Sequence, residues 1–400
     1  MVAVSNLFLF ACFTKWQVLK VYIPIATCYM LARAFRKEWW MPVVNFIVVV
    51  ALLSVSHLYR QFGPGADVNS YSLDITGPLM MMVMKLTSFA FDMHDARRWS
   101  MRRPSRPVPT TEDITKAPPS EKTSKGPIVE PASKFAVIRK YPTVLEFLGY
   151  ALLFPGLLAG PVVPFYEYRT FINGTYFAGI DVTRNALTGR KRRALYLFIV
   201  ACSSLVMYVC LKPLFEPSYM FHPDFMSRPW WYRALYVHMS NLVFRSKYYF
   251  AWMMAEGSYV IIGLGFRLSS TKKPLWDRLE NVNPIRIEST ADFRLLVSQW
   301  NVFTNQWLNA YVYRRLQKYF GKGTSSSRAS MITYIVSSLW HGFYPGYYLV
   351  SASAAWMTLV SRSMPFASLY LLFSDLQEYY MAVWQPVQEN RVLRPHVYAS

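Results

Sequence analysis

Residues 331–348, MITYIVSSLWHGFYPGYY, join an apolar run to one ionisable side chain, His341. The run from Met331 to Val336 is typical of a membrane helix, and the histidine follows at its edge. An imidazole in that position is costly unless it has a partner or a function. A single histidine can also be a satisfied packing residue, so His341 is a first candidate for a functional residue and needs support from elsewhere in the chain.

The composition predicts an all-α polytopic membrane protein. Of the 400 residues, 53% are hydrophobic and 17% aromatic, which is more apolar surface than a soluble fold of this length needs. Runs long enough to cross about 30 Å of hydrocarbon recur, and we expect roughly eight to ten membrane segments. The expected spans are Val18–Ala34, Pro42–His57, Ile75–Phe91, Val144–Val163, Ala194–Leu211, Tyr248–Phe266, Met331–Val350 and Ala354–Phe373, with a less apolar helical stretch at Phe293–Tyr319.

Residues 1–400 are expected to form a single membrane domain with one insert. Residues 93–140 are rich in Pro, Ser, Thr, Arg and Lys, and we expect a mobile cytosolic loop there because such a composition cannot bury a core. Val144–Val163 contains several prolines and glycines between basic flanks, so a broken or re-entrant segment is expected. Met1–Phe13 has no basic region or cleavage site, and no removable signal peptide is expected.

Basic side chains outnumber acidic ones, 43 to 22, for a formal net charge of +21. They lie in clusters, a pattern that marks cytoplasmic loops of membrane proteins and attracts anionic headgroups or polyphosphate ligands. No nucleic-acid recognition motif is interleaved with them, so nucleic acid is not an expected partner. The four cysteines lie in apolar segments and are expected to pack as small hydrophobes, without a disulfide or zinc site.

A second polar feature precedes His341. On a helix, Asn301, Thr304, Asn305 and Leu308 fall at i, i+3, i+4 and i+7 and share one stripe. Taken alone, the stripe could be interhelical hydrogen bonding. Together with a histidine it suggests chemistry, because an imidazole can take a proton from a hydroxyl while an amide donates to an oxyanion. No serine or cysteine nucleophile elbow is present, so direct transfer without an acyl-enzyme is the simpler hypothesis.

Two regions carry a family pattern. Trp300-Asn301 is followed by Asn305, Trp307-Leu308 and Tyr311-Val312-Tyr313, and later come Leu339-Trp340-His341-Gly342 and Pro345-Gly346-Tyr347-Tyr348. They resemble the two signature regions of membrane-bound O-acyltransferases (MBOAT), and within that superfamily the lysophospholipid acyltransferase branch. Further stretches that agree are His57–Arg60, Asp74–Met80, Phe147–Pro161 and Tyr248–Gly257.

The resemblance implies a multi-helix bundle around a central catalytic chamber, with His341 and Asn301 as the catalytic residues. The implied reaction re-acylates a lysophospholipid to a diacyl phospholipid with acyl-CoA as co-substrate, and neither a cofactor nor a metal is expected. His341 would be the general base, and Asn301 would position substrate or stabilise the oxyanion. The implied partners are acyl-CoA, lysophospholipid and membrane lipids, and the implied location is the endoplasmic reticulum membrane, crossed several times.

Seven further side chains are candidates for substrate binding. Asp74 could equally cap a helix, and Glu256 could simply pair with an arginine or lysine. The other histidines, His57, His94, His222, His238 and His396, are expected to be structural or solvated. The seven candidates are Trp300, Asn305, Thr304, Trp340, Tyr248, Glu256 and Asp74.

Two other functions stay open. A member of the superfamily that acylates a protein or a sterol would need a groove or lumenal tunnel for that acceptor. A non-catalytic polytopic lipid carrier or scramblase would need neither Asn301 nor His341. The family normally continues through several membrane helices after its histidine, whereas the polar ending Gln388–Ser400 comes early here, so a shortened C-terminus is expected.

Overall fold

The computed structural model describes residues 2–63, 74–102, 137–138, 140–177, 189–269, 273–290, 293–321 and 325–360. Almost all regular structure in these ranges is helical. The exception is a short antiparallel pair, β1 (Arg267–Leu268) and β2 (Pro274–Leu275), in which Arg267 lies opposite Leu275. The prediction of an all-α protein is confirmed.

The chain packs as two compact units. The first comprises Met1–Leu53, Leu73–Phe198 and Met254–Asn281, and the second comprises Ser54–Ser72, Ile199–Met253 and Val282–Ser400. Three long helices contribute residues to both: α3 (Met41–Phe62), α9 (Arg190–Leu211) and α11 (Trp230–Ile262).

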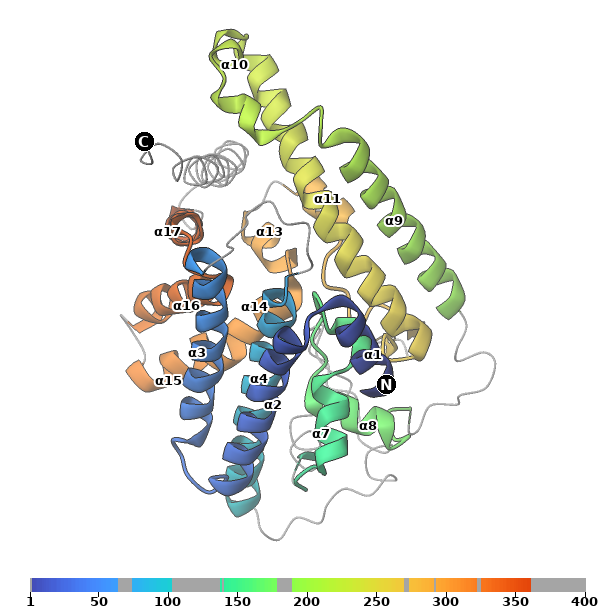
Figure 1. Ribbon diagram of the computed structural model, residues 1–400, viewed down its shortest axis with the longest axis vertical. Helices are drawn as coiled ribbons and strands as arrows, with labels where there is room; N and C mark the ends of the chain where they lie inside the picture. Colours follow the sequence, from blue (N-terminus) through green and yellow to red (C-terminus); the bar gives the residue numbers. More distant parts are fainter. Residues whose placement is uncertain are drawn as a thin grey trace, which may run out of the picture. The chain divides into compact units, whose positions relative to one another are not determined.

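In the first unit, helices α2 and α4 run side by side (Figure 1). Its core is aromatic: the ring of Phe89 lies 4.7 Å from that of Phe147 and 5.0 Å from that of Phe165, and Phe165 lies 5.1 Å from Tyr150. All four side chains are buried, so this cluster joins α4 to the segment after residue 140. The other elements of this unit are α1 (Val2–Cys12), α2 (Lys15–Ala34), α4 (Thr76–Arg102), α7 (Val144–Ala151), η1 (Phe154–Gly156) and α8 (Phe165–Ile172).

In the second unit, α16 and α17 pack against each other, and α14 leads through a π-helical turn, η3, into α15. Its elements, besides parts of the three shared helices, are η2 (Pro217–Phe221), α10 (Pro223–Ser227), α12 (Pro284–Ser289), α13 (Phe293–Gln299), α14 (Val302–Leu308), η3 (Asn309–Tyr313), α15 (Arg314–Phe320), α16 (Ser325–His341) and α17 (Pro345–Val360).

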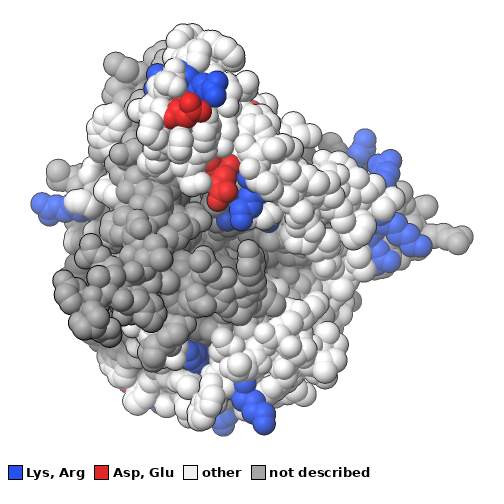
Figure 2. Space-filling model, turned by 45° about the horizontal axis from the view of Figure 1, so that its top comes forward, with Lys and Arg blue, Asp and Glu red and all other residues white. Residues whose placement is uncertain are grey.

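Two helices among the described residues are long and apolar enough to cross a membrane by length and composition. They are α3 and α9, of 22 residues each, with mean hydropathies of 2.1 and 2.3. Only 17% of the apolar window of α9 is buried, as expected for a surface that lipid covers. Figure 2 shows that the charged side chains of the described residues lie in separate groups on this face, among uncharged residues. The larger number of spans stays a prediction.

Several expected elements take a different form. Met331–Val350 is two helices rather than one, because Gly342 adopts φ +127° and Pro345 starts a new helix. The expected span Tyr248–Phe266 belongs to the longer α11, which ends at Ile262. Val144–Val163 is broken, as its prolines and glycines predict: α7 ends at Ala151, and η1 follows.

The expected loop at 93–140 begins later than predicted. Helix α4 continues to Arg102, since residues 93–102 contain neither glycine nor proline and the first proline of the segment is Pro104. Residues 103–136 lie outside the described residues, as does the part of the expected span Ala354–Phe373 beyond Val360.

Candidate functional site

His341 is the last residue of α16 and lies at the break before α17. Its imidazole is partly buried. It stacks on the ring of Tyr347, with centroids 5.2 Å apart and planes at 24°, and meets the ring of Trp340 edge-on at 4.7 Å and 71°. Two rings therefore fix the orientation of the imidazole, which suits a residue that exchanges a proton with a substrate.

His57, from the C-terminal part of α3, packs against the same break and is buried. Its Nε2 lies 3.2 Å from the carbonyl oxygen of Trp340. Because a carbonyl oxygen only accepts, Nε2 carries the proton in this hydrogen bond. A Cβ at Gly342 would lie 3.2 Å from His57 Nδ1, so glycine at 342 permits the close approach. His57 is thus buried rather than solvated, and it contacts both neighbours of His341.

Ser338 ties α16 to α17 one turn before His341. Its Oγ lies 2.7 Å from Oγ of Ser351 and 3.3 Å from the carbonyl oxygen of Tyr347. The sequence analysis did not single out Ser338, and it expected His57 to be structural or solvated. The available signals were a histidine at the end of an apolar span and a small polar residue three positions before His341. Both residues stabilise the backbone that carries the histidine.

Asn301 lies at a second break, between α13 and α14. Its backbone is left-handed, with φ 46° and ψ 58°, and it is the only non-glycine residue with positive φ in the described part of the chain. Left-handed geometry cannot continue a right-handed helix, so the helical stretch expected at Phe293–Tyr319 is interrupted at Asn301. The expectation that Asn301 shares the stripe of Thr304 and Asn305 is wrong, because Asn301 precedes α14. Asparagine is among the few L-residues that adopt this conformation readily.

Thr304 and Asn305 do lie on α14. The Asn305 side-chain amide donates to the carbonyl oxygen of Val297 at 3.1 Å and so spans the break. Thr304 is buried. Asn305 therefore holds the local chain geometry around Asn301, and a direct role of either side chain in substrate binding stays a prediction.

Aromatic rings connect the two breaks. Trp300 packs against α11, with its ring centroid 5.0 Å from that of Trp252 and 5.7 Å from that of Tyr248. On the other side, Trp307 of α14 lies 6.1 Å from Trp340 of α16. The second unit therefore contains both breaks, and aromatic rings pack around them. The candidate residues it brings together are Asn301, Trp300, Tyr248, Trp340 and His341.

A half-buried ion pair between α11 and α12 lies beside these rings. Arg245 donates two hydrogen bonds to Glu288, at 3.0 and 2.7 Å, and the Tyr249 hydroxyl binds the same carboxylate at 2.5 Å. The Tyr249 ring lies 6.1 Å from that of Trp300. The ion pair therefore links α11 to α12 next to Trp300.

Glu256 and Asp74 belong to the first unit, and each has a partner there. Glu256 is 1% exposed and accepts a hydrogen bond from Arg193 at 2.7 Å. Asp74 accepts from the backbone N–H of Thr76 at 3.0 Å and also bonds its hydroxyl, at the start of α4. These are the pairing and capping roles that the sequence left open, and substrate binding by either residue stays a prediction.

Within the described residues, no group of three His, Cys, Asp or Glu side chains is arranged to hold a metal ion. The candidate groups at the two breaks are the imidazole of His341 and the side-chain amides of Asn301 and Asn305. Such groups can transfer a proton and donate hydrogen bonds to a developing negative charge.

Comparison with known proteins extends this description. The model of the MBOAT, membrane-bound O-acyltransferase family matches residues 62–385, a range that includes both Asn301 and His341. The chain is 32% identical over 340 residues to a lysophospholipid acyltransferase of Schizosaccharomyces pombe, which covers 82% of this chain and 59% of that protein. It is 30% identical over 364 residues to lysophospholipid acyltransferase 6 of Drosophila melanogaster, with coverages of 88% and 45%. A lysophospholipid acyltransferase of Saccharomyces cerevisiae is 28% identical over 350 residues, with coverages of 84% and 52%. The chain thus spans about half the length of the curated relatives it matches.

Proposed function

This chain belongs to the membrane-bound O-acyltransferase family, and we propose on that premise that it is an acyl-CoA-dependent lysophospholipid O-acyltransferase. It would convert a lysophospholipid and acyl-CoA into a diacyl phospholipid and CoA. The names of the three relatives support the lysophospholipid as acceptor. Acyl-CoA supplies an activated acyl group, so the reaction as proposed needs no other cofactor. The endoplasmic reticulum membrane, crossed several times, is the proposed location.

The observation that carries the proposal is the setting of His341 and Asn301. Each lies at a break between two helices of the second unit, and rings of aromatic residues line both breaks. Polar groups at helix breaks can point into a chamber while the surrounding rings exclude water. Excluding water protects a thioester from hydrolysis and strengthens electrostatic interactions.

In the proposed mechanism, His341 acts as general base. Its imidazole takes the proton of the lysophospholipid hydroxyl as the hydroxyl oxygen attacks the thioester carbonyl carbon. The new C–O ester bond forms, the C–S bond breaks, and the CoA thiolate leaves with the proton that the imidazolium returns. Stacking on Tyr347 holds the imidazole in line for both transfers. General acid–base catalysis of this kind typically contributes about 10²–10⁴-fold.

Asn301 would donate its side-chain amide to the oxyanion that forms on the thioester carbonyl. The left-handed backbone turns this side chain out of the direction it would take on a helix. Loss of one oxyanion donor typically lowers turnover by about 10²–10³-fold. His57 would be a positioning residue: it contacts the Trp340 carbonyl and Gly342, and so acts on the reaction through His341.

The test measures transfer of a labelled oleoyl group from oleoyl-CoA to a panel of lysophospholipids. The enzyme source is microsomes prepared from cells that express the chain. His341→Ala is expected to lose activity by at least about 100-fold at unchanged expression. His238→Ala is the matched control, since His238 is a partly buried histidine of the same unit. Activity of His341→Ala near that of the control would overturn the mechanism. Transfer to a protein or sterol instead of lysophospholipids would overturn the proposed acceptor.

A further inference from the structure

A cavity of about 570 Å³ lies in the first unit, at the C-terminal end of α2. Its size falls in the range of roughly 300–1,000 Å³ that is common for small-ligand sites. None of its lining residues is a candidate for catalysis or substrate binding. The lining consists of Tyr29, Arg33, Arg36, Tyr141, Pro142, Thr143 and Val144.

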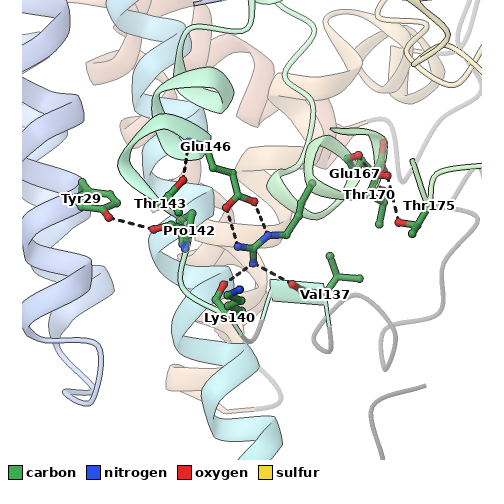
Figure 3. Close-up of polar contacts among 10 residues, drawn as sticks. Tyr29, Val137, Lys140, Pro142, Thr143, Glu146, Glu167, Thr170 and Thr175 are labelled. Atoms are coloured by element: carbon green, nitrogen blue, oxygen red, sulfur yellow. Dashed lines mark hydrogen bonds and ion pairs between the residues drawn. The ribbon is translucent and has the colours of Figure 1, made fainter. Parts of the chain in front are cut away.

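The cavity carries two positive charges that no described acidic residue balances. Arg33 and Arg36 are exposed, and neither forms an ion pair with another described residue; Arg33 Nη1 lies 3.4 Å from the Tyr29 hydroxyl. Glu146, one turn into α7, cannot serve as their partner, because Arg169 binds both of its carboxylate oxygens, at 2.6 and 3.0 Å (Figure 3). Among the described residues, no carboxylate therefore competes with an anion for these two arginines.

Hydrogen bonds connect the two segments that line the cavity. The Tyr29 hydroxyl donates to the carbonyl oxygen of Pro142 at 3.1 Å (Figure 3), and the Tyr141 hydroxyl donates to that of Tyr29 at 2.7 Å. Both phenol protons are thus used inside the protein. Burial raises the pKa of Tyr141, so its phenol stays uncharged at neutral pH. These contacts join α2 to the segment before α7.

The start of α7 contributes further positive character. Thr143 Oγ1 accepts a hydrogen bond from the backbone N–H of Glu146 at 3.2 Å, which leaves the hydroxyl proton for a ligand. The first backbone N–H groups of α7 point toward its N-terminus, where the helix dipole favours a negative charge. Two guanidinium groups, a hydroxyl and a helix N-terminus together select an anion, and guanidinium forms strong paired hydrogen bonds with phosphate.

The surroundings of the cavity favour a lipid over a free anion. Met30 on α2 is 62% exposed, and Val144 and Leu145 on α7 are 56% and 70% exposed. The membrane span expected from the sequence, Val18–Ala34, ends one residue after Arg33. A helix that crossed the membrane in this way would bring the cavity to the headgroup layer. Apolar side chains beside paired cations suit a molecule with acyl chains and a phosphate.

We propose that this cavity binds an anionic phospholipid, with Arg33 and Arg36 on its phosphate and its acyl chains along Met30, Val144 and Leu145. The site is separate from the proposed acyl transfer in the residues it uses. It would couple the protein to negatively charged membranes. Basic pockets between membrane helices are known to bind such headgroups.

The test is native mass spectrometry of the purified full chain titrated with phosphatidic acid, with phosphatidylcholine of the same acyl chains as the neutral lipid. Arg33→Gln/Arg36→Gln is expected to bind phosphatidic acid roughly 30-fold more weakly than the wild type, from about fivefold for each cation near an anionic headgroup. Lys15→Gln/Lys37→Gln is the control for net charge: it removes two exposed cations, one at the start of α2 and one just after its end, that do not line the cavity. Arg36→Gln alone is expected to lose about fivefold. Its side chain is exposed and forms no hydrogen bond or ion pair with another described residue, so we expect the fold to be retained.

Equal binding by the arginine variant and the wild type would overturn the proposal, and so would an equal loss in the lysine control, which would indicate general surface charge. Displacement of phosphatidic acid by inorganic phosphate at equal concentration would overturn the lipid assignment in favour of a free anion. His341→Ala is expected to bind phosphatidic acid like the wild type, so lipid binding and acyl transfer can fail independently.

Discussion

The left-handed backbone of Asn301 allows its side chain to be tested apart from its conformation. Left-handed geometry costs an ordinary L-residue roughly 1–2 kcal/mol, whereas glycine adopts it freely and asparagine more easily than most. Asn301→Gly removes the amide and keeps the turn. Asn301→Ala removes the amide and puts an unfavourable residue at φ 46°. We expect alanine to destabilise the protein by about 1 kcal/mol.

For glycine the change in stability is expected to be close to zero. The relief of backbone strain is offset by the larger freedom of glycine in the unfolded chain, about 0.5–1 kcal/mol. If the amide stabilises the oxyanion, both variants lose turnover alike, by about 10²–10³-fold. Activity and stability therefore separate in the glycine variant and fall together in the alanine variant.

Initial rates of oleoyl transfer and the temperature of half-unfolding in detergent would be measured for both variants. Asn173→Gly is a suitable control, because Asn173 ends α8 in the first unit and is exposed. A glycine variant with wild-type turnover would refute the role of the amide and leave only the turn. A glycine variant as unstable as the alanine variant would refute the argument from left-handed geometry.

Three further variants test other parts of the structure. Gly342→Ala is expected to lower the unfolding temperature by several degrees, because φ +127° disfavours a side chain and its Cβ would lie 3.2 Å from His57; an unchanged temperature would contradict this. Arg169→Leu removes the cation that pairs with the mostly buried carboxylate of Glu146, and we expect it to lower the free energy of unfolding by about 3–5 kcal/mol. Arg169→Leu/Glu146→Leu is expected to regain much of this loss, as measured by chemical denaturation. A double variant no more stable than the single one would argue against the pair. Burial by itself raises the pKa of Asp277, but two hydrogen bonds from Arg267, at 2.5 and 2.7 Å, outweigh this and lower the pKa below its usual value. Its stabilisation is therefore present above pH ~3.9 and is lost as the pH falls through the lower pKa of the folded state. Unfolding temperatures between pH 5 and pH 3 are expected to fall more steeply for the wild type than for Asp277→Asn, and parallel curves would count against the linkage.

The sequence predicted elements whose form depends on apolar patterning. The expected spans Val18–Ala34 and Ala194–Leu211 lie within α2 and α9, with boundaries that differ by no more than a few residues. The broken form of Val144–Val163 followed from its prolines and glycines, which act locally on the backbone. In each case the cause lies within the segment itself.

The geometry of the candidate site was less predictable, because it depends on contacts between distant segments. An asparagine within an amphipathic pattern fits a helix as well as a break, and only packing of Trp300 against α11 and the bond from Asn305 to Val297 distinguish them. Similarly, the position of His57 beside Trp340 joins residues far apart in the sequence. Local propensity carries no information about such pairs.

The two helix breaks themselves argue for an interior site. Away from water, backbone groups freed by a broken helix must find partners within the protein, and such breaks are tolerated only where protein buries them or where they line a cavity. At the first break, Asn305 supplies a donor to a carbonyl in the last turn of α13, where intrahelical partners run out. At the second, His57 supplies a donor to the carbonyl of Trp340. These two hydrogen bonds satisfy backbone carbonyl groups at the breaks, and they also hold the backbone next to Asn301 and His341. The contacts that stabilise the interrupted helices are therefore the same ones that orient the proposed catalytic groups.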